Sequence, residues 1–467
     1  NIMTNIILYP IIIILILVKI ISIYLTSFDL FGDEAQYWLW SKNLDLGYYS
    51  KPPFIAWFIN VYSKFFGDSF FSLKLIPSIV YLLTSLAVYD LCKGLGLKRD
   101  GAINCSLLFL IMPAVSFSSF IISTDIFLLF FWTISLSILL RLKKNPSLTN
   151  FVSLGATLGL AFLSKYAAIY FLICLIFLLI LDKEFRIIFF KNYIASILCF
   201  VCTTLILLPN IYWNLNNGWI TLQHTSDNAN LTNIKPSIYR GLEFLLVQLL
   251  MIGPFLFFIF CINFKNFKID STQKFLLVFS VPIFIIVLLE AIIVRANANW
   301  AAPALISFFI FLYINSLSAN INLRKLNIFF NTFLCLVLFV LIGISYPLKI
   351  FDRISGLKDF SYNLHNETSK NNILNYVISD RLIFASMSYE LRNKNLFFYM
   401  PHDDGREITN HFKITAPLKK EMSDNFLLVG DPNDIKYLTN KYRIEKKSTI
   451  KKIFTNKHID IYEVFFK

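Results

Sequence analysis

Polar and acidic side chains are concentrated between residues 29 and 53 of a sequence that is otherwise strongly apolar. Asp33 and Glu34 begin a stretch that mixes acids with aromatic residues at helical spacing, so both carboxylates are expected at the start of a helix that lies along a membrane surface. The helix dipole favours carboxylates there, but capping explains one acid more readily than two adjacent ones. We therefore predict a catalytic role for Asp33, with Glu34 as a second catalytic candidate.

A lysine on a stiff segment follows in the same loop. Lys51 precedes two prolines, which restrict the backbone around it. A fixed ammonium close to a bilayer can bind a phosphate, although a lysine that only extends its head group to the interface is the competing interpretation. We predict that Lys51 binds substrate, and we include the neighbouring Tyr49 among the substrate-binding candidates.

Two further ionisable residues occur where apolar stretches begin or break. Asp125 follows Ser123 and Thr124, a pattern that is also typical of a helix N-cap. Lys165 lies in a very short break, where a charge costs on the order of a few kcal/mol unless it is paired or reaches the interface. Asp125 is therefore a third catalytic candidate, and Lys165 is expected to meet an acidic partner or an anionic ligand.

Cationic, amide and aromatic side chains near later apolar stretches complete the candidate set. The remaining substrate-binding candidates are Arg240, Arg295, Asn299 and Trp300. His224 is a candidate metal ligand, although a lone histidine is more often an ordinary hydrogen-bonded residue. No cofactor is assigned beyond this, and a divalent metal is left open.

The composition excludes a single water-soluble globule. Of the 467 residues, 57% are hydrophobic and only 15% are charged, whereas soluble domains carry about 25% charged residues. Apolar stretches of membrane-spanning length recur instead. We predict about eleven transmembrane helices, near residues 6–26, 73–91, 101–117, 125–140, 150–163, 167–181, 193–212, 241–263, 275–294, 300–318 and 326–348. The fifth and sixth are short, and they could form either a tight hairpin or a broken helix.

The distribution of Lys and Arg between alternate loops predicts the orientation. Residues 92–100, 141–149, 182–192, 264–274 and 319–325 carry 14 Lys and Arg, whereas the alternate set, 27–72, 118–124, 164–166, 213–240 and 295–299, carries 7 in a longer total sequence. Because basic loops remain in the cytoplasm, the first set is expected inside and every candidate site residue outside.

Two domains are expected. Residues 1–350 form a transmembrane catalytic domain with external loops 27–72 and 213–240, and residues 351–467 form a small soluble α/β domain on the periplasmic side. The tail is assigned strands near 377–379, 395–399, 425–429 and 459–466, and a helix near 383–392. Its acids are scattered, so Asp380, Asp403 and Asp404 are expected to have no catalytic role.

The placement of the polar groups favours an enzyme over a transporter. A transporter places ionisable groups near the membrane midplane, whereas acids, cations, amides and tryptophans here gather at one interface. We therefore predict an interfacial enzyme with a lipid-borne substrate, and we keep a flippase or transporter of polyprenyl lipids as the alternative from another class.

An ordered set of motifs resembles the bacterial integral-membrane C-type glycosyltransferases, the relatives of the protein O-mannosyltransferases and of the lipid A aminoarabinose transferase. The motifs that carry the resemblance are Gly32 to Ser41, Gly47 to Pro53, Ser123 to Asp125, Ala161 to Tyr166, Leu208 to Asn214 with Asn217 to Trp219, Gln248 to Pro254, Ala296 to Ala304, and Ser379 to Arg381 with Ser386 to Leu391.

The resemblance implies a sugar donor linked to polyprenyl phosphate and transfer at the outer face of the inner membrane. The essential first-loop acid of such families maps to Asp33, a second acid maps to Asp125, and the lysine that contacts the lipid phosphate maps to Lys51. The aminoarabinose transferase has a glutamate near a metal where this chain has Ser50, which leaves metal dependence open.

The reaction that this resemblance implies is attack by an acceptor oxygen on the anomeric carbon of the sugar, with polyprenyl phosphate as the leaving group. Asp33 would deprotonate or orient the acceptor. Lys51, with Lys165, Arg240 or Arg295, would stabilise the charge that develops on the phosphate. The implied acceptor is lipid A, core or another envelope glycan; protein O-glycosylation is the alternative, and no nucleic acid is involved.

Overall fold

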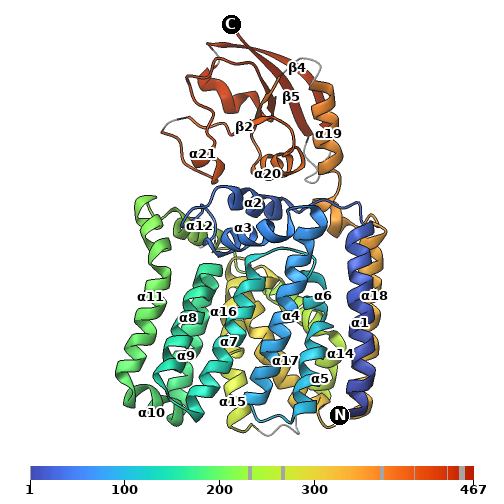
Figure 1. Cartoon of the computed structure of the whole chain (residues 1–467), viewed down its shortest axis with the longest axis vertical. Coiled ribbons are helices and arrows are strands. Elements are labelled where there is room, and N and C mark those ends of the chain that lie inside the picture. Colours follow the sequence, from blue (N-terminus) through green and yellow to red (C-terminus); the bar gives the residue numbers. More distant parts are fainter. Residues whose placement is uncertain are drawn as a thin grey trace. The chain divides into compact units, whose positions relative to one another are not determined.

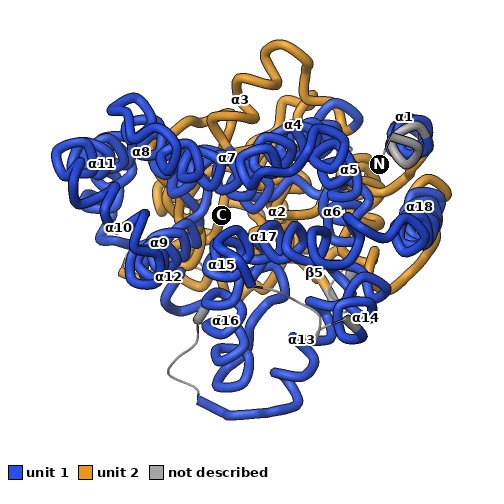
Figure 2. The backbone as a smooth tube through the Cα atoms, turned by 90° about the horizontal axis from the view of Figure 1, so that it is seen from below, with its two compact units in different colours: residues 1–24, 51–55, 71–341 blue, residues 25–50, 56–70, 342–467 orange. Residues whose placement is uncertain are grey.

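The chain divides into two compact units (Figure 2). The computed structural model describes residues 2–229, 234–263, 269–368, 373–403, 405–438, 440–451 and 458–467. The first unit, here called the helical unit, contains residues 1–24, 51–55 and 71–341; the second, here called the mixed unit, contains residues 25–50, 56–70 and 342–467. The sequence analysis placed all of 27–72 with the membrane part, whereas most of that loop packs with the tail in the structure.

The helical unit contains long apolar helices and several short ones (Figure 1). Its helices are α1 (Ile2–Leu25), α4 (Phe70–Gly94), α5 (Arg99–Leu110), α6 (Pro113–Ser118), α7 (Thr124–Lys144), α8 (Leu148–Ser164), α9 (Ile169–Leu181), α10 (Lys183–Lys191), α11 (Tyr193–Asn216), α12 (Ile220–Ala229), α13 (Ile238–Ile252), α14 (Pro254–Asn263), α15 (Ser271–Val278), α16 (Val281–Ile293), α17 (Ala302–Leu312) and α18 (Ile321–Gly343). Helix α10 occupies residues that the sequence analysis assigned to a loop.

Seven helical segments within the described residues are long and apolar enough to cross a membrane. They are Ile7–Leu25, Phe70–Gly94, Thr124–Lys144, Tyr193–Asn216, Ser271–Ile293, Ala298–Leu317 and Ile321–Gly343. Two further pairs, α9 with α10 and α13 with α14, qualify only together and are bent by 105° and 102°. The chain is therefore a multi-pass helical membrane protein with seven to nine candidate spans, and the expected count of eleven is not confirmed.

The expected third and fifth spans are too short for a physical reason. Residues 101–117 are broken because Met112 is extended (φ −62°, ψ 134°) before Pro113, and a residue that precedes proline avoids the helical conformation. Helix α8 has only 17 residues, which is about 26 Å of helix against a hydrocarbon core of about 30 Å. Similarly, α13 and α14 meet at Gly253, whose φ of +113° ends one helix before Pro254 starts the next.

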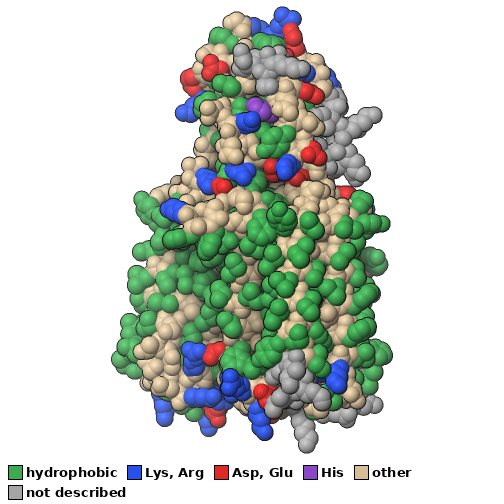
Figure 3. Space-filling view, turned by 45° about the vertical axis from the view of Figure 1, so that its right-hand side comes forward, with side chains coloured by type: hydrophobic (Ala, Val, Ile, Leu, Met, Phe, Trp, Pro, Cys, Tyr) green, Lys and Arg blue, Asp and Glu red, His purple; other side chains and the backbone are tan. Residues whose placement is uncertain are grey.

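The surface of the helical unit is predominantly apolar (Figure 3). Hydrophobic side chains cover the flanks of its helices, and Lys and Arg side chains gather at the lower end in that view. An apolar band of this kind is what a lipid-facing surface requires, because hydrocarbon cannot solvate charges.

The basic end of the helical unit joins loops that are far apart in the sequence. The Lys143 ammonium lies 2.7 Å from the Glu184 carboxylate and 3.2 Å from the Ser271 hydroxyl, and Arg141 pairs with Asp90 at 2.6 Å. These contacts bring together segments from four of the five basic loops or their borders. Helix α12 lies at the opposite end of the unit from α10 (Figure 1).

The mixed unit combines a five-stranded sheet with helices. Its elements are α2 (Gly32–Lys42), α3 (Phe54–Phe66), α19 (Leu357–Thr368), β1 (Asn375–Ile378), α20 (Arg381–Glu390), β2 (Phe397–Tyr399), α21 (Phe412–Thr415), β3 (Phe426–Val429), β4 (Tyr442–Lys451) and β5 (His458–Phe466). The sheet order is β2-β1-β3-β5-β4, with β1 parallel to β2 and β3, and β5 antiparallel to β3 and β4. Strand β4 was not expected from the sequence.

Helices α2 and α20 pack side by side in this unit, with their N-terminal ends together. A Cβ atom at Gly32 would lie 2.8 Å from the Leu382 Cβ atom, which is closer than real contacts allow. Further along, the Trp38 and Tyr389 rings meet edge to face at 5.0 Å. The absence of a side chain at Gly32 therefore permits the approach that places the first turns of both helices against each other.

Candidate active site

Three predicted residues meet in the helical unit. The Asp125 carboxylate accepts a hydrogen bond from the Lys165 ammonium at 2.6 Å through Oδ1, and another from the Asn299 amide at 2.9 Å through Oδ2. The side chains of Lys165 and Asp125 are only 15% and 14% exposed. The acidic partner expected for Lys165 is thus Asp125, and residues from three separate loops form one cluster.

Local backbone structure places each member of this cluster. Asp125 is in the first turn of α7, where Ser123 is the N-cap but makes no side-chain hydrogen bond to the helix. Lys165 is the extended residue (φ −160°, ψ 135°) between the end of α8 and a short 3-10 turn. Asn299 lies in the 3-10 turn Ala298–Ala301 that precedes α17.

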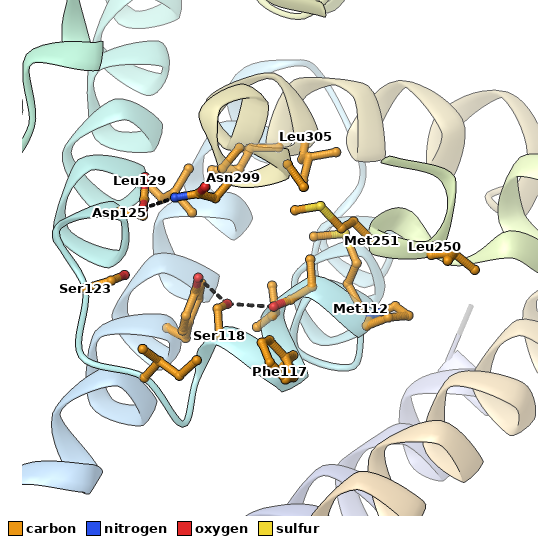
Figure 4. A pocket seen from close by; sticks show the side chains of 18 of the residues that line it. Met112, Phe117, Ser118, Ser123, Asp125, Leu129, Leu250, Met251, Asn299 and Leu305 are labelled. Carbon is orange, nitrogen blue, oxygen red and sulfur yellow. Dashed lines mark hydrogen bonds between the residues drawn. The ribbon is translucent and has the colours of Figure 1, made fainter. Parts of the chain in front are cut away.

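A cavity of about 520 Å³ adjoins the cluster (Figure 4). Asp125 and Asn299 form part of its wall, together with apolar side chains of α6, α7, α13 and α17, including Phe117, Leu129 and Met251. Other polar contacts on the wall include the hydrogen bond of 2.6 Å between the hydroxyls of Tyr81 and Ser118 and the one of 2.6 Å from the Ser118 hydroxyl to the Ala114 carbonyl. The cavity therefore combines an apolar wall with a small charged group, an arrangement suited to an amphipathic ligand.

The first-loop acid Asp33 meets an arginine from the tail in the mixed unit. Arg381 Nη1 lies 2.9 Å from Asp33 Oδ1 and donates to Gln36 Oε1 at 2.7 Å. The side chains of Arg381 and Asp33 are 41% and 32% exposed, so a substrate can still reach the carboxylate. Arg381 belongs to a motif that carries the family resemblance, but its pairing with Asp33 was not predicted.

The second acid of the pair has a different environment. Glu34 is fully buried, and its Oε2 accepts a hydrogen bond of 2.8 Å from the Phe31 backbone N–H. Because Phe31 precedes α2, this contact satisfies a free amide at the start of the helix. The contact is that of a capping residue, while a catalytic role for Glu34 remains a prediction.

Charged contacts join the first loop to the residues that follow α20 elsewhere in the mixed unit. Asp68 accepts hydrogen bonds from the Lys42 ammonium at 2.7 Å and the Trp38 indole at 3.0 Å, and lies 3.7 Å from the Arg392 guanidinium. Burial opposes ionisation of this carboxyl, but these donors outweigh it and lower the pKa of Asp68. Asp68 was not a candidate, because its sequence context, Gly67-Asp68-Ser69, is that of an ordinary turn.

The other predicted substrate contacts are spread over both units. Lys51 belongs to the short segment 51–55 of the helical unit, and the Tyr49 backbone N–H in the mixed unit lies 3.4 Å from His411 Nδ1. Arg240 donates to the carbonyls of Lys235 and, at 3.4 Å, Ile292. Arg295 is exposed and Trp300 is partly buried.

The described residues do not fit a metal. Within them, no group of three His, Cys, Asp or Glu side chains is placed to hold a metal ion. His224 lies on α12, and its Nδ1 atom is 3.2 Å from the Asn228 side-chain amide. Residues 230–233, which belong to the same predicted loop, are outside the described residues, as is Asp404.

Comparison with known proteins supports the family inferred from the motifs. Residues 50–213 match the family model described as dolichyl-phosphate-mannose-protein mannosyltransferase. The chain is 33% identical over 294 residues to the lipid A galacturonosyltransferase RgtD of Rhizobium johnstonii, and the match covers 62% of this chain and 61% of that protein. The predicted resemblance to the integral-membrane C-type glycosyltransferases is confirmed. The match spans about three fifths of the relative's length.

Solved structures show a similar fold. The crystal structure of ArnT from Cupriavidus metallidurans in the apo state has a TM-score of 0.63 at 12% identity, and the same protein bound to undecaprenyl phosphate has a TM-score of 0.65 at 14% identity. In both comparisons 97% of each chain is covered. At these identities the likeness concerns the fold alone.

Proposed function

We propose that the protein is a glycosyltransferase that moves a sugar from a polyprenyl-phosphate carrier to lipid A. The observation that carries this proposal is an apolar cavity of about 520 Å³ whose wall includes Asp125 and Asn299, with the Lys165 ammonium paired to Asp125 beside it. A polyprenyl carrier has an apolar chain and an anionic head; the cavity offers an apolar surface for the chain, and Lys165 is the proposed cation for the head. RgtD, a relative by sequence, is named as a lipid A galacturonosyltransferase, so galacturonic acid is the proposed sugar.

Lys165 can bind the carrier phosphate without leaving Asp125. An ammonium has three N–H donors, and the structure uses one of them on Asp125 Oδ1. The paired carboxylate then fixes the position of the ammonium, and the remaining donors can reach phosphate oxygens. Arg295 and Lys51 are the further proposed cations for the leaving phosphate.

Asp33 is the proposed general base toward the acceptor hydroxyl. A carboxylate that takes a proton in the transition state must be oriented toward the acceptor, and the contact of 2.9 Å with the Arg381 guanidinium fixes the position of the Asp33 carboxylate. Arg381 is accordingly a positioning residue in this proposal. The mixed unit would therefore contribute to acceptor chemistry as well as to stability.

The proposed location is the inner membrane, with the candidate site residues and residues 351–467 on the periplasmic side. The grouping of the basic loops at one end of the helical unit supports this orientation through the positive-inside rule. Eleven crossings remain the proposed topology, with α5–α6 and α8 as short or broken crossings beside the seven to nine candidate spans.

The direct test is transfer by the purified full chain in proteoliposomes. Undecaprenyl phosphate that carries labelled galacturonic acid is supplied with lipid A as acceptor, and the product is identified by mass spectrometry. We expect the wild-type protein to produce labelled lipid A and the Asp33→Asn variant to produce none. If lipid A stays unlabelled while the donor is consumed with another acceptor, the proposed acceptor is wrong.

Protein O-glycosylation is the second candidate, and the family model that matches residues 50–213 favours it, because that model is described as a protein mannosyltransferase. The same proteoliposomes with polyprenyl-phosphate mannose and serine- and threonine-containing peptides test it. If the peptide is labelled and lipid A is not, the protein is a protein O-glycosyltransferase and the first proposal is wrong.

A further inference from the structure

A second cavity, of about 360 Å³, lies within the mixed unit. Its wall combines the C-terminal half of α2 with α20, β2 and α21, so the first loop and the tail build it jointly. The volume is in the range of small-molecule sites, which is about 300 to 1,000 Å³. None of the candidate residues predicted from the sequence lines it.

Two buried ring nitrogens on this wall can donate hydrogen bonds to a ligand. Trp40 is 2% exposed, and its indole N–H has no hydrogen-bond partner within the described chain. Burial lowers the pKa of His411 to about 4, so the imidazole is neutral. Its Nδ1 atom is the acceptor for the Tyr49 backbone N–H, which leaves the proton on Nε2.

The unpartnered Trp40 N–H needs an explanation, because a buried N–H without a partner costs about 1 to 3 kcal/mol. Trp40 is held rigidly, since its ring stacks on Tyr48 at 4.4 Å and meets His411 edge to face at 5.6 Å. A rigid, unsatisfied donor that lines a cavity is suited to a ligand oxygen. The two ring nitrogens come from one packed aromatic cluster, so both can address the same ligand.

The rest of the wall combines further aromatic side chains with aliphatic and small polar residues, and it carries two cations, Arg392 and Lys394. Phe397 lies on the edge strand β2 with 57% of its surface exposed, and Phe384 stacks on Phe412 at 4.4 Å. Phe384 and Phe412 are buried, so the exposed Phe397 ring is the face that can pack against the apolar side of a sugar ring. Lys394 is exposed, and its ammonium makes no hydrogen bond or ion pair with the described residues.

We propose that this cavity binds an anionic saccharide, the sugar-phosphate head of the acceptor. Ring N–H groups of Trp40 and His411 would donate to sugar oxygens, aromatic side chains would pack on the rings, and Lys394 would bind a phosphate. The identification of this saccharide as the acceptor rests on the proposed function. The chemistry of the cavity wall favours an anionic sugar independently of that function.

The geometry of α2 connects this cavity to the candidate base. Trp40 follows Asp33 by seven residues, which is two helical turns, so both lie on one face of α2 about 10 Å apart along its axis. On α20, Arg381, Phe384 and Ser388 follow the same spacing, with the ion pair at one end and the cavity wall at the other. A saccharide in the cavity could therefore extend a hydroxyl toward Asp33.

The test is binding of a water-soluble probe to the full chain in detergent. The probe is the phosphorylated glucosamine disaccharide of deacylated lipid A, followed through the indole N–H resonance of Trp40. Thr415 is exposed on the cavity wall, so Thr415→Trp should fill the cavity and weaken binding at least tenfold, while Thr415→Ala should bind as wild type. Lys394→Glu, at an exposed site that tolerates the change, should weaken binding about tenfold.

Several outcomes would overturn the inference. Unchanged binding by Thr415→Trp and Lys394→Glu, equal binding of the unphosphorylated disaccharide, or preferential binding of a serine-containing peptide would each do so. Transfer assays separate this inference from the proposed function. If Thr415→Trp transfers sugar to lipid A with a normal KM, the cavity proposal is wrong while the proposed function stands. If the wild type binds the probe, Thr415→Trp abolishes that binding, and the wild type transfers no sugar to lipid A, the proposed function is wrong while the cavity proposal stands.

Discussion

At the scale of single residues, the two candidate acids differ in what surrounds them. Asp125 has a lysine and an amide within hydrogen-bonding distance in the helical unit, and Asp33 has an arginine from the tail in the mixed unit. The need of Lys165 for a partner followed from its position in a very short break. Arg381 could not be paired with Asp33 from the sequence, because 348 residues separate the two and no local pattern marks the contact.

The role of Asp33 predicts a loss of turnover without a loss of donor binding. Asp33→Asn should lower kcat by about 10² to 10⁴, the usual contribution of a general base, while donor affinity stays near wild type. Arg381→Met should lower kcat as well, and Arg381→Lys should restore part of it, because the charge remains while the geometry of the contacts with Asp33 and Gln36 changes. Single-turnover transfer and donor binding are the measurements.

The matched control for Arg381 is Arg353→Met, at an exposed residue of the same unit, which should behave as wild type. Normal transfer by Asp33→Asn would remove Asp33 from the mechanism. An Arg381→Met variant that transfers at the wild-type rate would reduce the ion pair to a structural contact.

The Asp125–Lys165 pair predicts a separation of stability from donor affinity. Lys165→Met should destabilise the protein, because it leaves the mostly buried Asp125 carboxylate without its charged partner. Removing one partner of a fully buried ion pair lowers the free energy of unfolding by about 3 to 5 kcal/mol. The double variant Lys165→Met with Asp125→Leu should regain stability but should not regain donor binding. Thermal unfolding and binding of undecaprenyl phosphate are measured on the same preparations.

A double variant that recovers both properties would show that Lys165 only neutralises Asp125. Recovery of stability alone supports a phosphate contact. The single change Asp125→Asn should have a smaller effect on donor affinity than Lys165→Met, because it retains the positive charge.

At the scale of elements, the packing of α2 on α20 fixes the geometry around Asp33. Helical spacing in 33–40 and in 383–392 indicated both helices, but not that they would pack against each other. The strand β4 was missed because its sequence, with four charged residues in the stretch 442–447, lacks a sustained apolar alternation. Sheet pairing with β5 stabilises it instead.

A methyl group at Gly32 should disrupt this packing. Gly32→Ala places a Cβ atom within 2.9 Å of two Leu382 atoms, so α20 must move and Arg381 should lose its position. We expect a lower Tm and lower transfer activity. Combining Gly32→Ala with Leu382→Ala removes the obstructing atoms beyond Cβ and should recover part of both; if the double variant is no better than Gly32→Ala alone, the close approach is not the cause.

The end of α20 predicts a pH dependence of stability. Burial, reinforced by the nearby Asp29 carboxylate, raises the pKa of Glu390 to about 7 from a reference value of 4.5. Between these values the folded state holds a proton that the unfolded state releases, so this group makes the protein less stable as pH rises from 4.5 to 7. His411, whose pKa is about 4, acts oppositely, since the unfolded state takes up the proton first.

The measurement is Tm against pH for wild type and Glu390→Gln. Glu390→Gln should lack the loss of stability that Glu390 causes as pH rises. The Tm of the variant minus the Tm of the wild type should therefore increase from pH 4.5 to 7 and stay constant above pH 7. A constant difference across the whole range would show that Glu390 does not titrate there.

At the scale of the whole molecule, the sequence identified the multi-pass class, the family resemblance and the alternation of basic and polar loops. It could not identify which apolar stretches form complete crossings, because hydropathy does not reveal a bend at Gly253 or the extended residue before Pro113. It also assigned residues 27–72 to the membrane part, since pairing with a tail some 300 residues away leaves no local signal. The packing of the tryptophans of α2 against Tyr389 of α20 and against His411, the residue before α21, is visible only in the folded unit.

Loop placement gives a final prediction about orientation. Lys143, at the end of α7, contacts Glu184 on α10 and Ser271 at the start of α15, so these basic segments share one side. Asp125, Lys165 and Asn299 join the alternate loops. A reporter active only outside the cytoplasm should therefore be inactive after Lys144 and active after Asn228 and Lys467. If the reporter is active after Lys144 and inactive after Asn228, the orientation is the reverse of the predicted one, and the Asp125–Lys165–Asn299 cluster lies on the cytoplasmic side. Activity after Asn228 but not after Lys467 would instead mean an odd number of crossings between them, so that the tail lies inside. Asp33 and Arg381, paired in one unit, could not then both follow the predicted topology.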